Sequence, residues 1–282
     1  MPLSDQDIAA FRTQLRVRFP DADDVFLSYG LAQEVIINIM GGEWWRDHIA
    51  SRAGPTPADN YFQGSREDEE GRYFHQHRVV ELGRLLYELQ DVNFFDDIVD
   101  DLRTRSLEGA VTELRVLRLL RMARWSVVPR RPTGVRGEDY DLDLHHPSGQ
   151  TIAVEIKSKD EGHNYSRTSV HGTFKQARQQ LPENGPGIVV LWVPTPWTRD
   201  PSFVGEAEGL FTGVLRNSSR INAIIILWEE WLQLVPSGRA VVTRFRTFLN
   251  ASPSTMVVGL QDLLAVIAPS QLLAPPRLPF LD

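Results

Sequence analysis

The chain has 282 residues and a formal net charge of −7, and its hydrophobic fraction of 42% and charged fraction of 24% are typical of globular proteins. This length is enough for one large domain or two ordinary ones, each with its own core. The absence of cysteine excludes disulfides, thiolate metal sites and a cysteine nucleophile.

Membrane and secretory signals are not evident either. Apolar runs are strand-sized and shorter than a membrane span. The first residues, MPLSDQDIAAF, lack the basic and then apolar pattern of a secretory signal. We therefore expect a cytoplasmic protein without a membrane partner.

Charge is distributed unevenly along the chain. Residues 1–102 carry 20 acidic and 9 basic residues, whereas residues 103–282 carry 17 acidic and 21 basic ones. The net acidity argues against a protein that coats nucleic acid non-specifically. The asymmetry instead predicts an acidic part joined to a part that can meet phosphates.

Helical periodicity dominates the first part of the chain. It predicts a helical N-terminal region over residues 1–103, with Ser4 as an N-cap. The helices are expected at residues 4–19, 25–40, 73–89 and 92–103. Residues 51–72 contain Pro, Gly, Asn and an acidic run, which are typical of a mobile loop.

The next helix is predicted at residues 106–123 and is apolar around most of its circumference. Glu113 lies within this apolar arc, and a buried carboxylate is costly unless it is paired or binds a metal. Two interpretations stay open for Glu113: a metal-associated acid, or an ion pair with Arg115 or another arginine of this region.

Strands and helices alternate in the rest of the chain, so the fold class is α/β, with a second domain expected at residues 104–250. Residues 158–172 are expected to form a polar loop, and residues 251–282 a C-terminal helix followed by a Pro-rich tail. The predicted strands are 125–130, 139–144, 152–157, 188–193, 221–228 and 240–248. The predicted helices are 173–181, 203–215 and 260–267.

Two of these strands carry an unusual acidic pattern. Apolar residues alternate with Asp139, Asp141 and Asp143 in the first strand, and with Glu155 and Lys157 in the second. Period-two alternation places each set on its own strand face. Because acidic residues are poor strand formers, this face requires an explanation.

Three explanations of the acidic face remain open. It is a solvated outer face, it forms ion pairs with Arg115 or Arg118, or Asp141 and Glu155 form a divalent-metal site with Lys157 beside them. The distribution of lysine and arginine along the chain favours the third explanation, the metal site. The chain has 27 arginines but three lysines, Lys157, Lys159 and Lys175, which lie within 19 residues of one another. A compact ammonium among carboxylates is not readily replaced by arginine.

The order helix, three strands, helix, strand over residues 106–194, with the tripeptide Glu155-Ile156-Lys157 closing the third strand, resembles the core of the PD-(D/E)XK nuclease superfamily. The resemblance implies a restriction-endonuclease-like αβββαβ core with a mixed central sheet, here preceded by a helical N-terminal region. It also implies a Mg²⁺-dependent (or Mn²⁺-dependent) nuclease that hydrolyses phosphodiester bonds, as restriction- or repair-like enzymes do. DNA is the favoured substrate, and the choice between DNA and RNA stays open.

The resemblance also assigns a metal site. Asp141 and Glu155 are expected to bind Mg²⁺, with the backbone carbonyl of Ile156 as a further ligand, and oxygen ligands are those that Mg²⁺ prefers. Asp139 is the second choice for the aspartate position. The motif proline is absent, because Glu138 precedes Asp139.

Further roles follow from the same resemblance. Lys157 is expected to orient the attacking water or to stabilise the transition state, and Glu113 is expected to support the metal. Gln176, or else Lys175, matches a polar residue that lies near the scissile phosphate in many members.

Basic residues near the site are candidates for contacting the nucleic-acid backbone. These are Arg130, Arg131, Arg136, Lys159 and Lys175. A solvated basic loop is the alternative for the three arginines. Many members act as homodimers, so a dimer is also possible. The alternative function is a catalytically inactive adaptor that keeps the fold and binds nucleic acid or a protein partner.

Overall fold

The computed structural model describes residues 2–50, 61–62, 69–131, 133–160, 162–234 and 238–267. The prediction of a mobile loop at residues 51–72 falls mostly outside the described residues, but it is wrong for residues 69–72, because a helix begins at Glu69. The predicted Pro-rich tail after residue 267 falls outside the described residues entirely. The described chain is α/β and contains a six-stranded mixed sheet, in agreement with the predicted fold class.

The chain divides into two compact units within its described residues. The first comprises residues up to Leu114 together with Trp231–Val242, and the second comprises Arg115–Glu230 and the chain from Thr243 onward. The division falls inside a helix, whereas the predicted domain boundary lies just before that helix.

Helices form the N-terminal part of the first unit. They are α1 (Asp5–Arg18), α2 (Asp24–Met40), α3 (Gly42–Trp45), the π-helix η1 (Arg46–Ala50), α4 (Glu69–Leu89) and α5 (Phe95–Thr104). The predicted N-cap is confirmed: Ser4 and Asp7 form a reciprocal capping box at the start of α1. Where α2 and α4 pack together, a Cβ atom at Gly83 would come within 2.7 Å of the Ala32 Cα, so only glycine fits there.

The six strands follow one another in the sheet in chain order. β2 pairs antiparallel with β1 and with β3, and β4 pairs parallel with β3 and with β5. The strands are β1 (Ser126–Pro129), β2 (Leu142–His145), β3 (Thr151–Ser158), β4 (Gly187–Trp192), β5 (Ile221–Leu234) and β6 (Gly238–Leu249).

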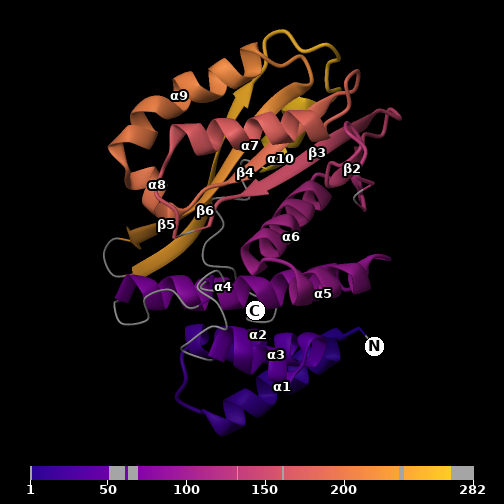
Figure 1. Cartoon of the computed structure of the whole chain (residues 1–282). Coiled ribbons are helices and arrows are strands. Elements are labelled where there is room, and N and C mark those ends of the chain that lie inside the picture. Colours follow the sequence, from indigo (N-terminus) through magenta and orange to yellow (C-terminus); the bar gives the residue numbers. More distant parts are fainter. Residues whose placement is uncertain are drawn as a thin grey trace. The chain divides into compact units, whose positions relative to one another are not determined.

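Four helices accompany the strands after α6 (Leu107–Met122). They are α7 (Arg167–Gln180), α8 (Thr195–Arg199), α9 (Pro201–Arg216) and α10 (Leu260–Ile267). Figure 1 shows α7 and α9 lying along the sheet. Their buried residues, among them Phe174 of α7 and Phe211 of α9, form a hydrophobic core with Ala153, Val189 and Ile224 of the sheet. This sheet face is called the α7 face below.

The predicted elements after residue 106 are present, with three departures. The strand predicted at residues 139–144 begins only at Leu142. Residues 158–172 were predicted as a loop, but α7 begins at Arg167, with the Ser166 side chain as its N-cap. The polar composition of this stretch conceals the helix start. The short helix α8 is a further departure, because the sequence did not predict it. It begins at Thr195, directly after Pro194.

No helix in the described ranges is both long enough and apolar enough to cross a membrane.

Candidate functional site

The candidate site lies on β3, in the middle of the sheet. Ile152, Val154 and Ile156 occupy one face of this strand, and Ala153, Glu155 and Lys157 therefore occupy the other. Because Ala153 belongs to the core beneath α7, Glu155 and Lys157 also face the α7 side. The predicted alternation is confirmed.

Glu155 is completely buried, at 0% exposure. The interpretation of this face as a solvated surface is therefore wrong for Glu155. β3 lies between β2 and β4, and α7 covers the face to which Glu155 points. A carboxylate in such a place loses its hydration and requires a compensating charge.

The compensating charge is Lys157. Its Nζ atom forms an ion pair with Oε1 of Glu155, and its side chain keeps 23% of its surface exposed. The two residues are two positions apart on one strand, which places them side by side on the same face. The partly exposed Lys157 side chain thus contacts the buried Glu155 carboxylate.

Asp141 lies immediately before β2 and is anchored to β3. Its carboxylate oxygen Oδ2 accepts a hydrogen bond of 2.6 Å from the backbone N–H of Ile156. Its own N–H donates to the carbonyl of Val154 at 3.1 Å. The Asp141 carboxylate therefore reaches the residue that separates Glu155 from Lys157. The structure brings Asp141, Glu155 and Lys157 together.

Asp139 is bound differently. It precedes β2 instead of lying on it, and its Oδ1 atom accepts N–H groups from Thr133 at 2.6 Å and from Gly134 at 2.8 Å. The backbone N–H of Thr133, above all, lowers the pKa of Asp139 below its ordinary value. The expectation that Asp139 and Asp141 share one strand face is wrong, because the regular strand begins at Leu142. Asp139 instead closes a turn.

Glu113 does not lie in a closed apolar arc. Its side chain is 23% exposed, and both of its oxygens accept hydrogen bonds from Arg105, at 2.9 and 2.5 Å. The interpretation as an ion pair with an arginine of this region describes these contacts, with Arg105 as the partner. Support of a metal by Glu113 remains a prediction.

Arg115 pairs with Glu229. Its side chain is 3% exposed, lies 3.9 Å from the ring centre of Trp192 and donates a 2.7 Å hydrogen bond to Glu229 of β5. Glu229 is itself buried. This buried pair, which sequence reasoning missed, joins α6 to β5 within the second unit.

Gln176 and Lys175 lie on the exposed side of α7, while Phe174 and Ala177 point into the core. A different residue links α7 to the end of β3: the Lys159 ammonium donates a 3.0 Å hydrogen bond to the Ser169 hydroxyl. Burial, together with the neighbouring Lys157 charge, lowers the pKa of Lys159 against the opposing effect of Asp160. Ser169 was missed because its stretch was predicted to be a loop.

The arginines near β1 differ in how far their side chains are exposed to solvent. Arg131 and Arg136 are exposed. Arg130 is half-buried; it lies 4.6 Å from the ring centre of Tyr140 and donates to the Tyr140 hydroxyl at 3.1 Å and to Asp143 at 3.3 Å. Arg130 is therefore engaged in an internal cluster on this side of the site.

Tyr140 completes that cluster. Its hydroxyl donates a 2.7 Å hydrogen bond to Oδ1 of Asp143, and its ring is buried in the core beneath α7. Burial, followed by the Asp143 carboxylate, raises the pKa of Tyr140 to about 12. The hydroxyl therefore stays protonated and holds Asp143 beside the strand end that carries Asp141.

Comparison of the chain with family models, with curated proteins and with solved structures finds no match.

Proposed function

We propose that this chain is a metal-dependent nuclease that hydrolyses phosphodiester bonds in DNA. One observation carries the proposal: the Asp141 carboxylate is bound to the N–H of Ile156, the residue that lies between the fully buried Glu155 and its ion-pair partner Lys157 in the sequence. Asp141, just before β2, thus adds a second carboxylate beside the Glu155–Lys157 pair of β3, and clusters of charged groups in buried surroundings are typical of functional sites.

The order of elements supports the same proposal. α6 is followed by β1, β2 and β3, then by α7 and β4, and the sheet is mixed. This is the αβββαβ order with a mixed central sheet that the resemblance to the PD-(D/E)XK superfamily implies. The Glu-Ile-Lys tripeptide stands on β3, the third strand of that order.

The donor set fits Mg²⁺ or Mn²⁺. Asp141 and Glu155 supply carboxylate oxygens, and the carbonyl of Ile156 points to the same side of β3 as its N–H, which meets Asp141. These are hard oxygen ligands, and a Mg²⁺ ion needs one or two carboxylates because it keeps several waters. When bound, such an ion lowers the pKa of a coordinated water and stabilises negative charge on phosphate oxygens.

The protein's own groups have distinct tasks in this proposal. Asp141 is prepositioned by its hydrogen bond to β3, so its carboxylate needs little reorganisation. Glu155 holds the Lys157 ammonium in place through their ion pair. Lys157, which is partly exposed, orients the attacking water or stabilises the charge that develops on the phosphate. Arg136 and Lys175 are exposed, and cations of this kind contact DNA phosphates.

The test is a cleavage assay of labelled single-stranded and double-stranded DNA and RNA in Mg²⁺, Mn²⁺ or EDTA. Wild type is expected to cut DNA when metal is present. Glu155→Gln, which keeps the shape of the side chain, should lower the rate by at least about 100-fold. Circular dichroism of both proteins shows whether the fold is retained. Equal cleavage by a folded Glu155→Gln variant would contradict the proposal.

The alternative is a catalytically inactive adaptor with the same fold. It is favoured by one feature of the site: the Glu155 charge already has Lys157 as a partner inside the protein, so an ion is not needed for electrical balance. A Mn²⁺ titration followed by electron paramagnetic resonance separates the two functions. A nuclease binds Mn²⁺ in a way that Asp141→Asn and Glu155→Gln weaken, whereas an adaptor shows no binding that depends on these residues.

A further inference from the structure

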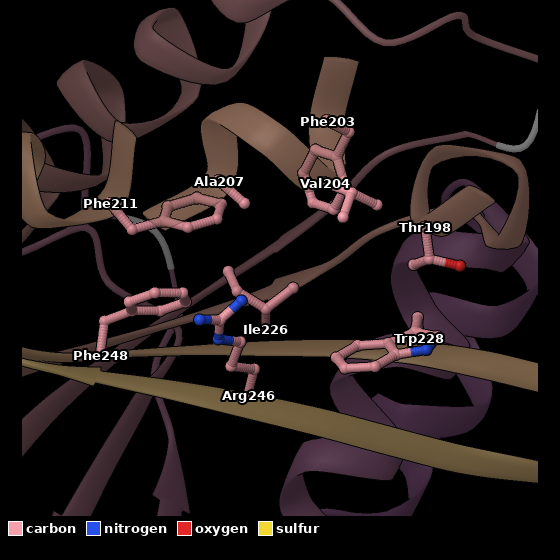
Figure 2. A pocket seen from close by; sticks show the side chains of 9 residues that line it. All are labelled: Thr198, Phe203, Val204, Ala207, Phe211, Ile226, Trp228, Arg246 and Phe248. Atoms are coloured by element: carbon pink, nitrogen blue, oxygen red, sulfur yellow. The ribbon is translucent and has the colours of Figure 1, made fainter. Parts of the chain in front are cut away.

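A cavity lies between α9 and the strands β5 and β6 of the second unit. Figure 2 shows side chains from the helix and from the strands pointing into one space. Its volume is about 130 Å³. Among the residues that line it are Thr198, Phe203, Val204, Phe211, Arg246 and Phe248.

The walls are mostly carbon and include four aromatic rings. Phe203, Phe211 and Ile226 are buried core residues. A cavity of about 150 Å³ with such walls takes up benzene. The space therefore suits a single ring and is too small for an extended apolar chain or a fused-ring cofactor.

The walls are held in place before any ligand binds. The ring of Phe203 packs against Tyr165 and Trp197, with ring centres 5.3 and 5.9 Å apart, and Phe211 packs 4.9 Å from Phe248. The Trp197 indole N–H donates a 2.6 Å hydrogen bond to the carbonyl of His163. Such preformed, largely apolar spaces with few polar groups are typical of small-molecule sites.

One charged group stands at the cavity. Figure 2 shows the Arg246 guanidinium between Phe248 and Ile226, and its Cζ atom lies 5.0 Å from the centre of the Phe248 ring. The same guanidinium pairs with Glu208 of α9, and the two side chains are 54% and 65% exposed. An ion pair this exposed contributes little stability, so a ligand carboxylate can replace Glu208 without a large loss.

We propose that this cavity binds a small molecule consisting of one aromatic ring with a carboxylate, whose ring fills the apolar space and whose carboxylate pairs with Arg246. A nucleobase fits less well. Its several donors and acceptors would face carbon walls without partners, and the Thr198 hydroxyl is already donated to the Thr195 carbonyl at 2.8 Å. This site does not depend on the proposed nuclease activity.

The test is a calorimetric titration of the full chain with benzoate, with the uncharged analogue benzyl alcohol, and with deoxycytidine monophosphate. Wild type is expected to bind benzoate more tightly than either of the other two. Arg246→Gln should weaken benzoate binding about tenfold, the effect of one charge-assisted hydrogen bond, and leave benzyl alcohol unchanged. Glu208→Gln should strengthen benzoate binding, because it frees Arg246 from its competitor.

A blocking variant checks that the ligand enters this cavity. Val204 is 59% exposed, so Val204→Trp covers the cavity with little risk to the fold, and it should weaken benzoate and benzyl alcohol alike. The proposal is overturned if wild type binds none of the three compounds, or if benzyl alcohol binds as tightly as benzoate. Tighter binding of the nucleotide, or benzoate binding that ignores Val204→Trp, also overturns it.

Discussion

Two glutamates that the sequence associates with one metal site lie in very different surroundings. Glu155, on β3, is completely buried and meets the ammonium of Lys157. Glu113, on α6, is partly exposed and is held by the two-pronged guanidinium of Arg105. The pair on β3 thus joins a buried carboxylate to a compact ammonium, whereas the pair at α6 joins a partly exposed carboxylate to the planar fork of an arginine.

The two glutamates differ in how well the sequence predicts their contacts. Alternation along a strand fixes the face of each residue, so Glu155 and Lys157 had to lie together. Helical neighbours of Glu113 define an apolar arc, but they do not reveal that Arg105, just before the helix, folds back onto the carboxylate.

Lys157→Ala should destabilise the protein most. It leaves the Glu155 carboxylate buried without its cation, and breaking a buried pair in this way costs about 3 kcal/mol. Urea unfolding in EDTA measures the change. The double variant Lys157→Ala/Glu155→Leu is the control, since it removes both charges and should recover much of the loss. A single variant as stable as wild type would show that the ion pair does not compensate the buried charge.

Tyr140→Phe should cost about 1 kcal/mol, the usual net value of a lost hydrogen bond. The hydroxyl donates to Asp143 and accepts from Arg130, so both partners lose a contact in a half-buried place. Thermal unfolding of the variant beside wild type checks this value. Unchanged stability would mean that Asp143 and Arg130, without the Tyr140 hydroxyl, are satisfied equally well by each other or by water.

Glu113→Gln should change stability by less than about 1 kcal/mol, because its partner Arg105 is half-exposed and surface pairs contribute little. The same urea experiment provides the measurement. A loss as large as that of Lys157→Ala would erase the distinction between the two glutamates.

Asp139→Asn should produce the smallest change, and one that depends on pH. The pKa of Asp139 is lowered in the folded chain, so its charge stabilises the fold above the unfolded pKa of about 3.9. That contribution is lost as the pH falls through the lower, folded pKa. The Tm difference between wild type and variant should be constant above about pH 5 and vanish in stronger acid. A difference that persists at low pH would exclude a role of the charge.

Local patterns explain how much of the fold the sequence predicts. The N-cap at Ser4 and the placement of Glu155 and Lys157 side by side on β3 depend on residues a few positions apart, and both are confirmed. The start of α7 was missed because its N-cap, Ser166, stands in a polar stretch that also resembles a loop. Polar composition alone does not separate a loop from a helix turned toward solvent.

Contacts between distant residues explain what the sequence leaves open at the site. The Asp141 hydrogen bond to Ile156 depends on how β2 begins, which decides between Asp139 and Asp141. The pairing of Arg115 with Glu229 joins positions 114 residues apart, so patterns among neighbouring residues do not predict it. The aromatic cavity under α9 likewise gathers residues from four elements.

The two neighbouring aspartates provide the most direct test of the proposed metal site. Asp141→Asn and Asp139→Asn are compared with wild type in one DNA-cleavage assay with Mg²⁺, since both substitutions keep shape and remove one charge. We expect Asp141→Asn to lose at least about 100-fold in rate, while Asp139→Asn cuts nearly as fast as wild type. Equal losses in the two variants, or full activity of a folded Asp141→Asn variant, would contradict the proposed metal site.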